Sequence, residues 1–190
     1  MDWLNLDGEL FETIVTGEAE GLRTLTESTR LRLRYRFSRI EAEAPYEHLT
    51  GSRHRMAVEG RYRGPLDARA GYELEYNDRE DLSTATSFTS VSPTRHEVFA
   101  EAEYPFGSAW EAEGKVEYRY SRYHDANTDA ATGLDRIRED GRLRLQATVS
   151  RELPWQLEAF GEYEYTDNDS NIAGYDYTAN VYRIGLERFF

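Results

Sequence analysis

The sequence predicts an all-β fold, an antiparallel up-and-down β-barrel of about eight strands. Apolar and charged side chains alternate with a period of two through about eight separate runs of ten or eleven residues. Tight turns and longer polar segments connect these runs alternately. The chain also carries 14 Tyr, 8 Phe and 3 Trp among 190 residues, although its mean hydropathy is -0.78. Disordered chains are poor in aromatic residues, so this composition indicates a folded protein.

The strands are predicted from the alternation. In the first run, residues 29–39, Leu31 and Tyr35 fall on one face and Arg32 and Arg36 on the other. Seven further runs repeat the pattern: 53–63, 66–76, 96–105, 110–120, 141–150, 156–165 and 180–190. A period of two is the signature of a strand with two different faces. About eight such strands make the smallest single-chain membrane barrels.

The connections alternate in length. Three tight turns are expected at Gly64-Pro65, 105–108 and Leu153-Pro154. The longer polar segments are 41–52, 78–94, 124–140 and 167–178. Short turns at one rim and long loops at the other are typical of outer-membrane barrels, and they place both chain ends on the periplasmic side.

Residues 1–26 fit no single pattern. Leu10, Ile14 and Leu22 have helical spacing, whereas Phe11 and Val15 also fit a strand. A ninth strand would start the chain outside, and bacterial single-chain barrels have even strand numbers. We therefore expect a short helical or extended segment over 1–26, either below the barrel or inside it as a plug, followed by a barrel domain over 27–190.

The positions of the aromatic residues indicate that lipid contacts the apolar stripe. They concentrate toward the two ends of the strands, with small residues such as Ala70, Ala100 and Gly114 between them. This is the arrangement of two aromatic girdles around an apolar band. The expected girdle is Tyr35, Phe37, Tyr62, Tyr76, Tyr104, Trp110, Tyr118, Tyr120, Trp155, Tyr163, Tyr165 and Phe190. A soluble β-barrel that binds an apolar ligand inside remains the alternative, because its strands alternate in the same way.

The opposite stripe predicts a lumen filled by paired charges. Buried charges are tolerated only when they are paired and hydrogen-bonded. We expect Arg30–Arg36 to project toward Glu73, Glu75, Glu101 and Glu103 across the lumen and to plug it. The complete expected network is Arg30, Arg32, Arg34, Arg36, Arg55, Arg61, Glu73, Glu75, Glu101, Glu103, Glu113, Lys115, Glu117, Arg142, Arg144, Glu158, Glu162 and Arg183. A channel or export barrel, porin-like, for small or polyanionic solutes remains a second alternative.

Charge and composition exclude other classes. The net charge of -13 disfavours nucleic acid, whose backbone requires a basic surface. No cysteine is present, and no stretch approaches the roughly 18–20 apolar residues of a membrane helix. The first ten residues lack a basic, apolar leader pattern, so we expect no signal peptide in this chain.

Signals for catalysis and metal binding are weak. His124-Asp125 with Ser121 nearby is a common combination in polar loops, so we expect no catalytic residues and no enzyme. Asp167, Asp169 and Asn171 alternate as calcium ligands often do, as do Asp125, Asn127 and Asp129. Turn formation is the better interpretation of both groups, so we expect no metal and no cofactor.

The C-terminal stretch EYTDNDSNIAGYDYTANVYRIGLERFF resembles the last hairpin of bacterial outer-membrane β-barrel proteins. RYSRYHDANTDAATGLDRIREDGRLRL resembles the preceding hairpin, and GEAEGLRTLTESTRLRLRYRF resembles the start of a first strand. The resemblance implies a Gram-negative outer-membrane location and insertion by the outer-membrane assembly machinery, which reads the last strand as a sorting signal. The positions that match this signal are Tyr182, Ile184, Leu186 and Phe190, whereas Arg188 departs from it.

Together these observations predict an outer-membrane β-barrel that acts as a structural or anchoring module with exposed loops. Its expected partners are outer-membrane lipid and lipopolysaccharide, with Arg39, Arg79 and Arg122 as candidate contacts to phosphate groups at the upper rim. No nucleic-acid partner is expected.

Overall fold

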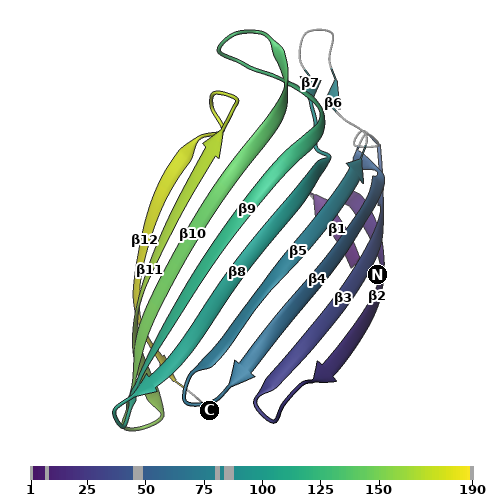
Figure 1. Ribbon diagram of the computed structural model, residues 1–190. Helices are drawn as coiled ribbons and strands as arrows, with labels where there is room; N and C mark the ends of the chain where they lie inside the picture. Colours follow the sequence, from purple (N-terminus) through teal and green to yellow (C-terminus); the bar gives the residue numbers. More distant parts are fainter. Residues whose placement is uncertain (1, 7–8, 45–48, 80–81, 84–87, 189–190) are drawn as a thin grey trace.

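The computed structural model describes residues 2–6, 9–44, 49–79, 82–83 and 88–188, and these form an all-β antiparallel structure (Figure 1). Ten strands form one sheet in the order β1-β2-β3-β4-β5-β8-β9-β10-β11-β12, and β6 and β7 pair separately. The ten are β1 (Asp2–Leu6), β2 (Glu9–Thr24), β3 (Thr29–Ala42), β4 (Gly51–Arg63), β5 (Asp67–Arg79), β8 (Pro93–Phe106), β9 (Trp110–Thr128), β10 (Asp135–Leu153), β11 (Leu157–Ser170) and β12 (Tyr177–Arg188). Among the described residues, no helix is long and apolar enough to cross a membrane.

The N-terminal segment is a strand. β2 pairs with β3 from Glu12 opposite Ala42 to Thr24 opposite Arg30, so it belongs to the sheet. The expectation of a short helical or extended segment apart from the strands is therefore wrong here. The strand count is therefore nine long strands and the short β1, rather than about eight. A ninth strand was excluded because bacterial single-chain barrels have even strand numbers. This reasoning failed because β1 adds a tenth strand, which makes the number of strands even again.

The sheet is curved and open. Within the described residues β1 pairs only with β2, and β12 pairs only with β11, so the two edges are not joined. Figure 1 shows the strands curving around one side of the molecule. Arg79 on β5 lies 3.6 Å from Glu12 on β2, although these strands are three steps of about 4.8 Å apart in a flat sheet. The sheet therefore curves toward the face that carries these two side chains.

Short and long connections lie at opposite ends of the sheet, as the sequence predicts (Figure 1). Two of the long segments are shorter than expected. β9 continues to Thr128 and β10 begins at Asp135, whereas β11 continues to Ser170 and β12 begins at Tyr177. The segment between β5 and β8 contains the small pair β6 (Leu82–Ser83) and β7 (Phe88–Thr89). The Ser90 amide after β7 donates to Asn127 Oδ1 at 3.1 Å, which attaches this segment to β9.

The described residues contain almost no apolar core. Ile40 and Ile172 are their only buried hydrophobic side chains, whereas Leu33, Leu186 and Ile184 are 54%, 68% and 92% exposed. Most buried side chains are polar or charged. The sheet therefore has one exposed face of apolar side chains, called here the apolar face, and one face of charged side chains.

Candidate functional site: the charged face

The strand register collects the predicted charges on one face of the sheet. Arg36 on β3 lies opposite Arg55 on β4, which lies opposite Glu75 on β5, which lies opposite Arg95 on β8. Because side chains alternate strictly along a strand, every second residue from each of these positions is on the same side. All eighteen residues of the expected network fall on this side, called here the charged face.

Carboxylates on this face lie between arginines of neighbouring strands. Glu75 is only 4% exposed and accepts from Arg55 Nη2 at 2.5 Å through one oxygen and from Arg95 Nη1 at 2.6 Å through the other. Arg69 and Glu101 form a two-fold hydrogen bond with both distances at 2.7 Å. Planar pairs of this kind are the strongest that Arg and a carboxylate form.

The C-terminal half of the charged face follows the same rule. Arg142 Nη2 lies 3.1 Å from Glu117 Oε1, and Arg144 Nη2 lies 2.8 Å from Glu164 Oε2. Arg183 on the outermost strand pairs with Glu162. These arginines stand beside glutamate-rich strands, and the register brings each into contact with one of them.

The partners of the first arginine strand differ from the prediction. Arg36 Nη2 lies 2.6 Å from Glu18 Oε2, and Arg32 Nε lies 3.4 Å from Glu20 Oε1. Both carboxylates come from the adjacent β2, so the expected ion pairs from this strand to Glu73, Glu75, Glu101 and Glu103 across a lumen are wrong for Arg32 and Arg36. An adjacent strand lies only about 4.8 Å away and provides the nearer partner. Sequence reasoning missed Glu18 and Glu20 because residues 1–26 were not placed in the sheet.

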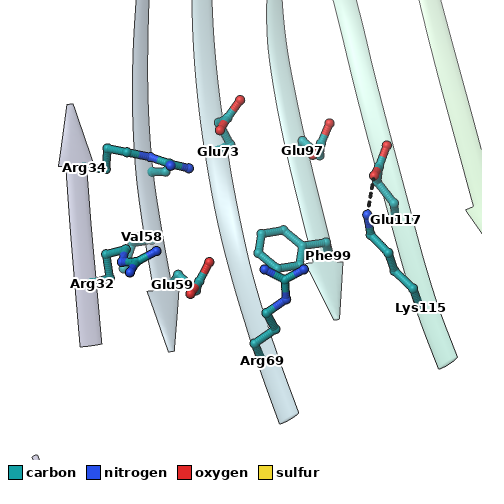
Figure 2. A pocket seen from close by; sticks show the side chains of 11 residues that line it. Arg32, Arg34, Val58, Glu59, Arg69, Glu73, Glu97, Phe99, Lys115 and Glu117 are labelled. Carbon is teal, nitrogen blue, oxygen red and sulfur yellow. Dashed lines mark ion pairs between the residues drawn. The ribbon is translucent and has the colours of Figure 1, made fainter. Parts of the chain in front are cut away.

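A cavity of about 210 Å³ lies at the centre of the charged face. Figure 2 shows Arg34, Glu73, Glu97 and Glu117 extending into a shared space from four different strands. Lys115 Nζ lies 3.5 Å from Glu117 Oε2 at one side. The lining is an equal mixture of four basic and four acidic side chains: Arg32, Arg34, Arg69, Lys115, Glu59, Glu73, Glu97 and Glu117.

Phe99 is the unexpected member of this cavity. It lies on the charged face beside Arg69, whose Cζ is 5.9 Å from the ring centroid (Figure 2). The ring occupies the space above Gly71, where an added Cβ would lie 2.8 Å from Phe99 Cε1 and 2.7 Å from the Val58 carbonyl oxygen. An aromatic residue in the charged phase of a strand, opposite a glycine, is the sequence signal that could have identified it.

The predicted girdle residues with described side chains lie on the apolar face, apart from Trp155, which occupies the β10–β11 turn. Phe37 and Tyr76 are toward the end with long connections and Tyr35 is near the middle of β3, whereas Tyr62 and Trp110 are near the short turns. Phe190 lies outside the described residues. The other three sorting-signal positions, Tyr182, Ile184 and Leu186, are exposed on the edge strand β12.

Three histidines belong to the same band of aromatics, which sequence reasoning did not identify. The Tyr35 hydroxyl lies 2.9 Å from His54 Nδ1. The ring centroids of Tyr76 and His124 are 4.8 Å apart. His96 Nδ1 lies 2.7 Å from the Tyr72 hydroxyl.

The structure does not bring the weak catalytic candidates together. His124 Nε2 lies 2.8 Å from Thr94 Oγ1 on the apolar face, whereas Ser121, opposite Arg95, is on the charged face. Of the rim arginines, Arg39 and Arg122 are exposed. Arg79 is largely buried against Glu12, so the prediction that it is an exposed cation of the rim is wrong.

Asn171 and Asp129, two of the residues considered as calcium ligands, form hydrogen bonds with backbone groups. Asn171 Oδ1 accepts from the Glu139 amide at 2.8 Å, and its Nδ2 donates to the Ile137 carbonyl at 2.9 Å. Asp129 Oδ1 accepts from the Ala131 amide at 2.9 Å, and this backbone hydrogen bond lowers the pKa of the Asp129 carboxyl. No group of three or more His, Asp or Glu side chains within the described ranges is arranged to hold a metal ion.

Comparison with known proteins gives no assignment: no protein-family model matches the chain, and no curated protein is significantly similar to it.

Proposed function

We propose that this chain is a β-barrel of the bacterial outer membrane that acts as a structural or anchoring module. The observation that carries the proposal is the inverted arrangement of its side chains. The large apolar residues are exposed on one face while the carboxylates of the other face, such as Glu75 and Glu117, are buried in ion pairs. A soluble sheet that left this many apolar side chains in water would lose its main source of stability. Lipid acyl chains would cover the apolar face instead.

The proposal requires the sheet to close. A membrane offers no hydrogen-bond partners to an open strand edge, so only closed barrels span it with strands. Nine successive antiparallel pairings give β1 and β12 opposite directions, so these two strands have the polarity of an antiparallel pair. Pairing between them would produce a barrel of ten strands, an even number as in other bacterial single-chain barrels.

The charged face would then form the interior. Its arginines and glutamates are paired mainly between adjacent strands, which is the condition for keeping charges away from bulk water. Such an interior favours a filled barrel over an open pore. The channel alternative therefore has less support than the anchoring function.

The proposed partners of the barrel are inferred from two groups of exposed side chains, one on β12 and one near the long connections. The exposed side chains of Tyr182, Ile184 and Leu186 on β12 are suited to recognition by the outer-membrane assembly machinery. Arg39 and Arg122, exposed near the long connections, are suited to phosphate groups of lipopolysaccharide.

Refolding tests this proposal. The chain should fold in zwitterionic detergent micelles, and the folded form should migrate differently from the heated form in a gel. Without detergent it should aggregate. A monodisperse folded protein in plain buffer would contradict the membrane assignment, and steady open currents in planar bilayers would favour the channel over the filled barrel.

A further inference from the structure

A second cavity, of about 280 Å³, lies on the charged face next to the long connections. Unlike that of the central cavity, its lining contains more basic than acidic side chains, and each of its arginines is held by a carboxylate. Four arginines line it against one acidic residue, Asp140; the arginines are Arg95, Arg119, Arg138 and Arg142. We propose that this cavity binds a compact oxyanion, a phosphate or carboxylate group carried by a small polar molecule. The inference concerns the cavity alone and holds whether or not the proposed membrane function is correct.

Two of the arginines are neighbours on adjacent strands. Arg119 on β9 and Arg142 on β10 are directly opposite in the register, a position in which like charges destabilise a sheet. Arg142 Nη2 lies 3.1 Å from Glu117 Oε1, whereas Arg119 Nη2 lies 2.5 Å from Glu97 Oε2 and 3.8 Å from the same Glu117 oxygen. Glu117 also lies near Lys115, so one carboxylate serves three cations. An anion beside both guanidinium groups would add an acceptor to the Glu117 carboxylate that they share.

Arg142 also has an unused donor. Its Nε is buried and has no hydrogen-bond partner among the described residues, which is also true of Arg144 outside this cavity. A buried guanidinium N–H without an acceptor is costly, and a ligand oxygen at this position would satisfy it. Guanidinium groups bind phosphate and carboxylate oxygens through paired N–H donors, which fits the chemistry proposed here.

The remaining wall is rigid. Arg138 donates to Asp140 Oδ1 at 2.9 Å, and its Cζ lies 3.4 Å from the Tyr175 ring centroid and 4.7 Å from that of Tyr123. Asn168 Nδ2 holds the connection before β12 by donating to the Tyr175 carbonyl at 2.8 Å. A wall that is already ordered loses little entropy when a ligand binds.

The test measures binding of inorganic phosphate, glucose 6-phosphate and glucuronate by calorimetry, with the full chain in zwitterionic micelles at constant ionic strength. Neutral glucose is the reference ligand. At least one anion should bind saturably and at least tenfold more tightly than glucose. The phosphate compounds and glucuronate distinguish the two oxyanion types, and binding of none of the three would overturn the proposal.

Arg142→Gln should weaken the binding at least tenfold. Arg144→Gln is the matched control, because Arg144 is the next residue on the same face of β10 and also pairs with one glutamate, but it does not line this cavity. It should change the affinity less than twofold. If Arg142→Gln fails to fold, Arg142→Lys retains the charge without the Nε donor and should also weaken binding. Equal effects at the two positions would show nonspecific charge attraction and refute the site.

Discussion

Replacement of Val116 by Arg tests the lipid contact of the apolar face directly. Val116 is six residues beyond Trp110, the first residue of β9, and its side chain points to the apolar face. Six residues extend about 20 Å along a strand, which corresponds to roughly 15 Å of height at a tilt of about 40°. The apolar band of a membrane barrel is about 25 Å tall, so Val116 lies near its middle.

The expected cost of Val116→Arg is about 2–4 kcal/mol in a bilayer, or roughly a 30- to 700-fold change in the folding equilibrium. Val149→Arg is the matched control. Val149 lies opposite Ala112, two residues from the start of β9, and is therefore close to the short-turn rim. Val116 and Val149 are 42% and 44% exposed, so contact with water would give them equal and small effects, within about 0.5 kcal/mol.

The assay is urea unfolding of each variant in phospholipid vesicles, followed by tryptophan fluorescence and gel migration. A membrane barrel should show a large cost at Val116 and a cost below about 1 kcal/mol at Val149, because an arginine near the rim reaches the headgroups. Equal costs at the two positions would refute the assignment of the apolar face to lipid.

Two further predictions concern the central cavity and the β9–β10 connection. Gly71→Ala should destabilise the fold by about 1–3 kcal/mol, since the new methyl group would lie 2.7 Å from the Val58 carbonyl oxygen and 2.8 Å from the Phe99 ring. Gly114→Ala, with nothing within 4 Å, should change stability by less than about 0.5 kcal/mol in the same urea titration. Similar losses for the two variants would argue against the close packing of Val58 and Phe99 over Gly71. Because the folded pKa of Asp129 is lowered, its carboxylate should stabilise the turn above the unfolded pKa of about 3.9 and lose this contribution as pH falls through the lower folded value. The Ala131 amide chemical shift in NMR spectra should therefore titrate below the usual aspartate range, and a midpoint at or above it would contradict the hydrogen bond.

The alternation predicted the faces of the sheet well, because a period of two assigns each residue of a strand to one side without knowledge of its neighbours. Arg36, Arg55 and Glu75 were placed together for this reason, and the register confirms their shared face. The outward exposure of the apolar stripe was predicted from the aromatic residues near the strand ends, because alternation alone also fits a soluble barrel.

The strand β2 could not be recognised from its own pattern. Its apolar-face positions after Val15 are Gly17, Ala19 and Gly21, which provide no large apolar side chains, and Leu22 lies in the opposite phase. Helical and extended interpretations therefore remained equally consistent with the residues. The identity of ion-pair partners depends on which strands are neighbours, so omission of β2 also led to the wrong partners for Arg32 and Arg36.

The meander order of the strands makes the molecule modular. Each long strand pairs only with strands that adjoin it in the order of the sheet, and almost all ion pairs stay within that range. The contact between Arg79 and Glu12 is the exception. A cut in the short β8–β9 turn would separate the chain into two pieces that meet along β8 and β9, through the Ser90–Asn127 hydrogen bond and, in the proposed closed barrel, along β1 and β12. Co-expressed halves therefore have a defined route to reassembly. For the same reason, gain or loss of one hairpin would alter the circumference of the proposed barrel while leaving the charge pairs of distant hairpins intact.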